Sequence, residues 1–314
     1  MVRKLGKDHV IYAFAPDCAF AWHVEDGETF WVEMDDCYGG MFRSERDLRT
    51  EAVDTSRFDA AVGPVHIGGA EAGDTLCVEI LEIRLADRGV MVTARGLGIF
   101  GDRIEAPHTK IIPVEDGFAC FSGTVRLPLS PMIGVMGVLP AAGSFRCTVP
   151  GDFGGNMDTK ELTVGSKVYL PVFQDGAGLA VADLHACMGD GELSGTGLEI
   201  AGEVRLRVSV IKGRRLPRPV VETESAVLTI ATESTMEAAV RTAAMDMISL
   251  LRERLGLDFP DAYRLLSAAC DVRVSQVVNG VYTLKVRAPK RLFAEARRIP
   301  PASPAAADLL KSTH

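Results

Sequence analysis

The chain has 314 residues, of which 47% are hydrophobic and 24% are charged, and its formal net charge is −8. A chain of this length and composition can bury the core of one large domain or of two modest ones. An acidic chain offers no broad basic surface to phosphates, so neither nucleic acid nor an anionic membrane is expected as a partner. No run of about 18 apolar residues occurs in the sequence, so no transmembrane helix is expected.

The N-terminal segment and the cysteines point to a cytoplasmic protein. The opening MVRKLGKDHVIYAFAP lacks the long apolar stretch and the cleavage site of a signal peptide. The seven cysteines are scattered and form no CxxC pair, so we expect reduced thiols. Cys37 has no histidine obviously paired with it and is interpreted as a core residue rather than as a nucleophile.

Short β-prone segments, separated by glycine, proline and aspartate, fill the first 232 residues. The expected strands cover residues 28–34, 75–85, 89–97, 117–129, 143–149, 167–173, 198–213 and 225–232. Strands at this spacing are typical of a sandwich or barrel, and no strand–helix alternation indicates a doubly wound parallel sheet. We expect a mainly β protein of the α+β class, with a β-sandwich or jelly-roll-like body over residues 1–232.

The pattern becomes helical near residue 234. Ser234 and Glu237 have the spacing of a capping box, an apolar face recurs through the following turns, and Gly256 stands where a helix would stop. A second helix is expected in PDAYRLLSAAC, with Pro260 near its first turn. The alanine- and methionine-rich face of the first helix is expected to pack on the sheet.

The C-terminal part is expected to add a hairpin and a tail. Asn279-Gly280 is a strong hairpin-turn dipeptide between two β-prone runs. Residues 233–290 are therefore expected to form a helix–helix–hairpin segment that packs on the body and is not an independent domain. Residues 291–314 are expected to form a C-terminal tail that begins as a short helix and ends without fixed structure.

The most unusual polar segment is VADLHACMGDGE, residues 181–192. If VADLH is a strand, Asp183 and His185 share one face, where a divalent metal such as Zn²⁺ accepts both ligand types. Asp190 and Glu192 follow directly, among glycines that permit a tight backbone. The plain alternative is a solvated surface strand followed by a hairpin turn at Asp190-Gly191.

A second polar cluster lies upstream in PGDFGGNMDTKELTVG. Gly154 and Gly155 could present backbone N–H groups as an oxyanion nest, Asn156 could polarise a carbonyl, and Asp158 could be a further metal ligand. The alternative here is an ordinary connecting loop. The sequence has no GxSxG, no P-loop and no GxGxxG followed by a helix, so serine-hydrolase and nucleotide-dependent functions lack support.

Taken together, the ordered motifs of this chain resemble the acetamidase/formamidase family. They are DDCYGG (35–40), GPVHIGGAEAGDTLCVEILEI (63–83), SPMIGVMGVLP (130–140), GGNMDTKELTVGSKVYLPV (154–172), ADLHACMGDGE (182–192) and AYRLLSAACDVRVSQVV (262–278). The resemblance implies hydrolysis of a small amide to carboxylate and ammonia, on a β-sandwich-like body that binds a divalent metal. A homo-oligomer, with a dimer as the expected form, is also implied.

The resemblance, read with amide chemistry, gives each site residue an expected role. Asp183 and His185 would hold the metal, expected to be zinc, with Asp158 as a third ligand, while calcium is an alternative as a structural ion. Glu192 would move the proton between water and the leaving nitrogen. Asn156, or the Gly154-Gly155 backbone, would stabilise the oxyanion. Asp190 would complete the catalytic group.

Two positions depart from the family pattern as we describe it. The family has histidine where this chain has Phe153, and glutamine where it has Met188. Contact of either position with metal or substrate would imply another preferred amide, weaker metal binding or lost activity. The competing functions are a metal-dependent isomerase, a hydrolase of a larger or cyclic amide, and a non-catalytic binding protein whose acidic loop holds Ca²⁺.

Overall fold

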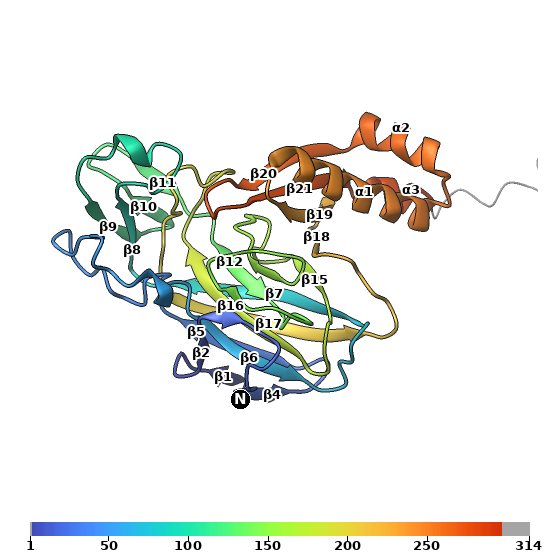
Figure 1. The fold of residues 1–314 in the computed structure, drawn as a ribbon, viewed down its shortest axis with the longest axis horizontal. Coiled ribbons are helices and arrows are strands. Elements are labelled where there is room, and N and C mark those ends of the chain that lie inside the picture. The colour runs from blue at the N-terminus through green and yellow to red at the C-terminus, as the bar shows by residue number, and fades with distance from the viewer. Residues whose placement is uncertain (1, 297–314) are drawn as a thin grey trace, which may run out of the picture.

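Two packed sheets form the body of the protein, which we describe from a computed structural model covering residues 2–296 (Figure 1). The larger sheet has nine strands in the order β1 (Arg3–Leu5), β5 (Thr29–Met34), β17 (Gly202–Ile211), β7 (Thr75–Leu85), β15 (Lys167–Pro171), β18 (Val220–Glu222), β19 (Ala226–Glu233), β21 (Tyr282–Pro289), β20 (Asp271–Gln276). The smaller one has the order β14 (Gly154–Asn156), β12 (Met132–Gly137), β16 (Ala177–His185), β6 (Ala61–Ile67), β2 (Val10–Ile11), with β4 (Trp22–Val24) parallel to β6.

The core lies between these two sheets. On β17, Val204, Leu206 and Val208 are buried while the intervening arginines are not, which is the period of two expected of a strand with one covered face. Strand β16, paired on both sides, is buried along its whole length. The polar end of β16 is therefore inside the protein, and a surface strand with a solvated Asp–His pair is excluded.

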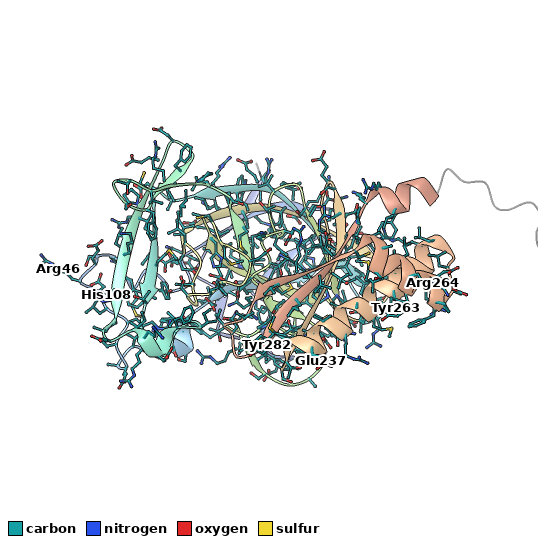
Figure 2. The ribbon with its side chains drawn as sticks, turned by 90° about the horizontal axis from the view of Figure 1, so that it is seen from above. Arg46, His108, Glu237, Tyr263, Arg264 and Tyr282 are labelled. Atoms are coloured by element: carbon teal, nitrogen blue, oxygen red, sulfur yellow. The ribbon has the colours of Figure 1, made fainter. Side chains whose placement is uncertain are left out.

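Two small sheets extend the body. One has four strands, β11 (Arg126–Pro128), β10 (Phe118–Cys120), β9 (His108–Glu115) and β8 (Arg88–Thr93), and the other pairs β13 (Phe145–Arg146) with β3 (Ala13–Phe14). Single 3₁₀ turns occur at Thr55–Arg57 and Gly101–Arg103. Seen from above, the four-stranded sheet, marked by His108, lies at the end of the molecule opposite the helices, marked by Tyr263 (Figure 2).

The helices pack beside the C-terminal strands. Helix α1 (Met236–Leu255) lies against β19 and β21, α2 (Phe259–Ala269) packs on α1, and α3 (Arg291–Ala296) follows β21. The N-cap of α1 is Thr235, which accepts from the N–H of Ala238, so the capping position predicted at Ser234 was wrong by one residue. Gly256 ends α1 with φ +69°, as predicted. Part of the predicted C-terminal tail, residues 297–314, lies outside the described residues.

The mainly β fold class is confirmed, although the strand prediction was incomplete. Strand β12, which lies between β14 and β16, was missed, and so were β9 and β14, because their glycine, proline and methionine content conceals the β pattern. The expected strand 117–129 is two strands, β10 and β11. Within residues 2–296 no helix is long and apolar enough to cross a membrane.

Candidate active site

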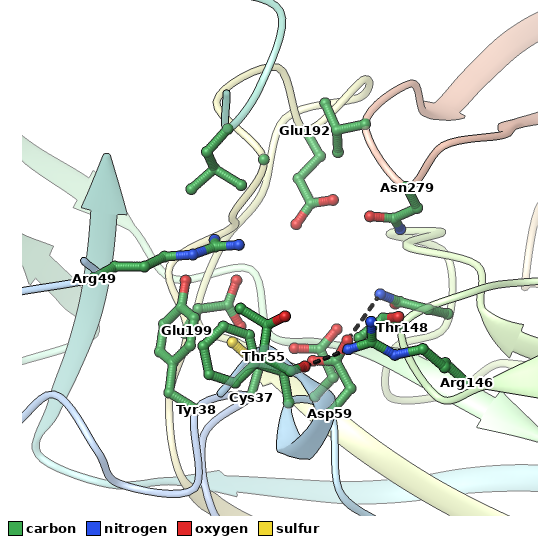
Figure 3. Close-up of a pocket in the computed structure, with 16 residues that line it drawn as sticks. Cys37, Tyr38, Arg49, Thr55, Asp59, Arg146, Thr148, Glu192, Glu199 and Asn279 are labelled. Atoms are coloured by element: carbon green, nitrogen blue, oxygen red, sulfur yellow. Dashed lines mark hydrogen bonds between the residues drawn. The ribbon is translucent and has the colours of Figure 1, made fainter. Parts of the chain in front are cut away.

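Five segments that are distant in sequence enclose a pocket of about 230 Å³ between the body and the β20–β21 hairpin (Figure 3). The acidic side chains that line it are Asp59, Asp183, Glu192 and Glu199. Asn156 and Asn279 supply amides, and Arg49 and Arg146 supply guanidinium groups. A pocket of this size has room for a small polar molecule rather than for a polymer.

His185 contacts two carboxylates of the pocket lining, Asp183 and Glu199, through one ring nitrogen. Its Nε2 lies 3.2 Å from Oδ1 of Asp183 and 3.1 Å from Oε2 of Glu199, and all three side chains are at most 4% exposed. Within the described residues none of these three atoms makes a hydrogen bond of acceptable geometry. Buried polar atoms left in this state are rare, because each costs about 1–3 kcal/mol.

This triangle has the dimensions of a metal site. Ligand atoms about 2.0–2.2 Å from a tetrahedral ion lie about 3.2–3.6 Å from one another, close to the distances at His185. Asp158, His185 and Glu192 form a second group whose ligand atoms lie within 4.8 Å, and Cys37, Asp183 and Glu199 form a third. The residues present therefore fit a divalent ion with nitrogen and oxygen ligands.

The surroundings hold these ligands in place. Thr196 donates to Oε1 of Glu199 at 2.9 Å, which leaves Oε2 for His185. A Cβ added at Gly134 would collide with Oδ2 of Asp183 and would lie 2.7 Å from Oδ1 of Asp158. The glycine opposite Asp183 on β12 thus makes room for the two carboxylates.

Backbone strain is concentrated at the same place. In the described residues six non-glycine positions have positive φ, and four of them are the acidic residues Asp59 (55°), Asp158 (43°), Asp183 (63°) and Glu192 (51°). Each such residue costs on the order of 1 kcal/mol, and strain of this kind is typical of functional sites. The β12–β16 register is the same on both sides of Asp183, and only the pair of Asp183 with Gly134 is missing from it.

The pKa values reflect an excess of buried negative charge. Burial and the nearby Asp183 raise the pKa of Asp158 to about 7, and burial, opposed by His185, raises the pKa of Asp183 to about 6. Burial and Asp158 raise the pKa of Glu192 well above its ordinary value. Burial alone would lower the pKa of His185, but Glu199 and Asp183 outweigh it and raise that pKa well above its usual range. A cation placed among these groups would relieve their repulsion.

Asn156 lies between two carboxyl groups and is only 6% exposed. Its Nδ2 donates to Asp59 at 3.3 Å, and with the amide turned over the nitrogen would donate to both Asp158 oxygens at 3.0 and 2.9 Å. The N–H of Gly154 donates to Gly151 at 3.0 Å, so it is not free to form the oxyanion nest that the sequence suggested.

Asp190 lies apart from the other predicted residues. It is not among the residues lining the pocket, and it pairs with Lys285 at 2.8 Å and with Lys160 at 3.0 Å. Burial raises its pKa, but Lys285 and Lys160 outweigh this and lower it. The backbone next to Asp190 is also fixed, since Gly191 donates to Ser275 at 2.8 Å. Asp190 therefore anchors the Glu192 loop to the C-terminal hairpin.

The structure brings together five of the six predicted residues and adds three that were missed. Asn156, Asp158, Asp183, His185 and Glu192 meet at one place. The additions are Glu199, Asp59 and Asn279. A signal for Glu199 existed, since it is the one charged residue in the apolar run LEIAG. Asp59 offered no signal, and Asn279 was read only as a turn residue.

The two departures from the family pattern lie away from the pocket. Phe153 is buried between Phe14 and Phe145, with ring centroids 5.1 Å away in each case. Neither Phe153 nor Met188 is among the described residues that line the pocket. The pocket walls therefore contain neither substitution.

Comparison with known proteins supports one family over nearly the whole chain. The model of the acetamidase/formamidase family matches residues 4–146 and 141–294. The formamidase of Methylophilus methylotrophus is 28% identical over 261 residues, which cover 63% of each chain. The match thus spans less than two thirds of that curated relative.

Solved structures give the same result at the level of the fold. A recombinant predicted acetamidase/formamidase from Thermoanaerobacter tengcongensis superposes with a TM-score of 0.91 at 39% identity, covering 95% of this chain and 98% of that one. An acetamidase from Bacillus halodurans has a TM-score of 0.91 at 39% identity, with 93% and 99% covered.

Proposed function

Because this chain belongs to the acetamidase/formamidase family, we propose that it is a metal-dependent amidase that hydrolyses a small aliphatic amide to a carboxylate and ammonia. The observation that supports this proposal most directly is the triangle of Nε2 of His185, Oδ1 of Asp183 and Oε2 of Glu199. Three buried atoms that converge without hydrogen bonds, beside a small polar pocket, suit a catalytic metal better than a structural ion pair.

Asp183, His185 and Glu199 would hold the ion, with Asp158 as a further ligand. Mixed nitrogen and oxygen ligands favour zinc over calcium, which prefers oxygen alone. Such an ion, when bound, polarises a carbonyl oxygen and lowers the pKa of water. The Glu199 carboxylate takes a place among the ligands that the sequence analysis did not assign.

Glu192 is the proposed acid–base residue. Its carboxyl lines the pocket, and burial and Asp158 raise its pKa, which makes the Glu192 carboxylate a stronger base toward water. It takes a proton from the attacking water and delivers it to the amide nitrogen, so that the C–N bond breaks and ammonia leaves. Asn156 is still proposed to stabilise the oxyanion that forms from the substrate carbonyl. Asp190 positions the loop that contains Glu192 and takes no part in the reaction.

The test is ammonia release from formamide, acetamide, a longer linear amide and a cyclic amide by the wild type and by Glu192→Gln. Turnover of the small linear amides is expected, and kcat should fall about 10²–10⁴-fold in Glu192→Gln while the metal content stays unchanged. Glu105→Gln, a change at an exposed residue that does not line the pocket, is the matched control and should retain full activity.

Other results would favour the competing functions. Bound metal with no ammonia from any of the four amides would indicate a binding protein. Turnover of the cyclic amide alone would indicate a lactam hydrolase. Normal turnover in Glu192→Gln would remove Glu192 from the acid–base role.

A cytoplasmic dimer remains part of the proposal. The described cysteines are all free thiols, which agrees with a reducing compartment. Size measurement of the purified protein in solution tests the dimer.

A further inference from the structure

The turn that joins β20 to β21 forms part of the pocket wall. Val278 and Asn279, in this turn, line the pocket. They reach it from the C-terminal hairpin, more than 80 residues along the chain from Glu192. Neither Val278 nor Asn279 is among the proposed metal ligands, so the polar member of this wall calls for an explanation.

Gln276 fixes the turn from inside. Its Oε1 accepts from the backbone N–H groups of Val278 at 2.7 Å and Asn279 at 3.0 Å. Its Nε2 donates to Val281 O at 3.0 Å and to Oγ1 of Thr283 at 2.9 Å, and the residue is 0% exposed. With both ends of its amide bonded, Gln276 holds the backbone of Asn279 in one position.

The side chain of Asn279 is oriented by Asp158. Nδ2 of Asn279 donates to Oδ2 of Asp158 at 2.7 Å. This hydrogen bond turns the amide nitrogen of Asn279 toward Asp158. The amide oxygen then faces away from Asp158, toward the pocket and the side on which Glu192 lies (Figure 3). No described residue donates to this oxygen.

We propose that Oδ1 of Asn279 accepts a hydrogen bond from the N–H of the substrate amide nitrogen, and so selects primary amides. The inference rests on the proposed amidase function. A primary amide presents two N–H donors and no free lone pair on nitrogen, and this side of the pocket offers two acceptors, Asn279 and Glu192. An N-alkyl group would place carbon against the Asn279 oxygen and leave a buried acceptor without its partner. Asn279 forms no bond to the substrate; it positions the leaving nitrogen for Glu192.

The experiment compares acetamide with N-methylacetamide in the wild type, Asn279→Ala and Val272→Ala, with metal content measured for each. Where N-methylacetamide is not hydrolysed, its inhibition constant against acetamide replaces its kcat/KM. The wild type should favour acetamide, and Asn279→Ala should reduce the preference about tenfold, as expected for one lost hydrogen bond. Val272→Ala, an exposed change on β20 outside the pocket lining, should keep the wild-type ratio. Asn279→Ser serves as a second variant if Asn279→Ala does not fold.

The ratio of kcat/KM for acetamide to that for N-methylacetamide distinguishes two roles of Asn279, which are binding the substrate and holding Asp158 in place. If Asn279 acts only by holding Asp158, both amides lose activity equally, the ratio stays constant and the inference is overturned. An active wild type with that result leaves the proposed function intact. Absence of ammonia from every amide would instead overturn the proposed function, and this inference with it.

Discussion

At the scale of single residues, the site depends on a glycine, which leaves space, as much as on its charged side chains. Gly134 on β12 leaves the space that Asp183 and Asp158 fill. Four acidic residues with left-handed backbone around the pocket show that the fold holds these groups against their local preference.

Gly134→Ala is therefore expected to disturb the metal site without removing a ligand. Its new methyl group would push apart the carboxylates of Asp183 and Asp158. We expect metal affinity to fall about 10–100-fold, the range found when groups that orient metal ligands are changed, as measured by competition with a chelating dye. Gly123→Ala is the control, since a Cβ there meets no atom within 4 Å. Equal affinity in both variants would show that the space at Gly134 is not needed.

Residue identities alone indicated which side chains could take part in a site, but not how these side chains are arranged in space. Asp183 and His185 could be proposed as ligands because two ligand types stood two positions apart. Glu199 was missed because its role depends on a bridge between His185 and Glu199 that joins separate segments. Asp190 was assigned to catalysis because it stands beside Glu192 in sequence, but the chain turns there and its side chain meets Lys285 instead.

At the scale of elements, polar contacts join the C-terminal hairpin to two loops, one containing Asp158 and the other containing Glu192. Lys285 on β21 has a fully buried side chain and pairs with Glu161 at 2.6 Å and with Asp190 at 2.8 Å. Thr159 donates to Ser275 on β20 at 2.8 Å. The loop that contains Asp158 and the loop that contains Glu192 are thus both held by the hairpin.

Lys285→Met should be strongly destabilising for this reason. The change keeps the side-chain volume but leaves Glu161 without its lysine partner and Asp190 with Lys160 alone, and we expect a loss of about 2–4 kcal/mol in the free energy of unfolding. Urea unfolding measures it. Lys290→Met is the control, because the Lys290–Glu222 pair has a lysine side chain that is 42% exposed, and exposed pairs contribute about 0–1 kcal/mol. Equal losses in the two variants would contradict the anchoring role of Lys285.

The elements were predictable where local pattern decides them. Helix α1, its stop at Gly256 and the hairpin turn at Asn279-Gly280 follow from periodicity and turn chemistry. Strand β12 was not predictable, because MIGVMG contains two glycines whose purpose is to admit groups from other strands. One of them, Gly134, is explained only by Asp158 and Asp183.

At the scale of the whole molecule, the site is assembled from the full length of the chain. The pocket takes residues from near Cys37 to Asn279, and the nine-stranded sheet contains strands from both ends of the chain. The sequence order of strands followed by helices indicated the α+β class, but the sheet order could not be read from it. From the sequence, only the resemblance to a family indicated that the scattered motifs belong to one site.

The central claim is that Asp183, His185 and Glu199 form one metal site at which Glu192 acts without binding the ion. The most direct measurement is elemental analysis of the purified wild type, Glu199→Gln and Glu192→Gln after exchange into zinc and dialysis. About one zinc ion per chain is predicted for the wild type and for Glu192→Gln, and a small fraction of that for Glu199→Gln. A Glu199→Gln protein that retains zinc as fully as the wild type would contradict the account.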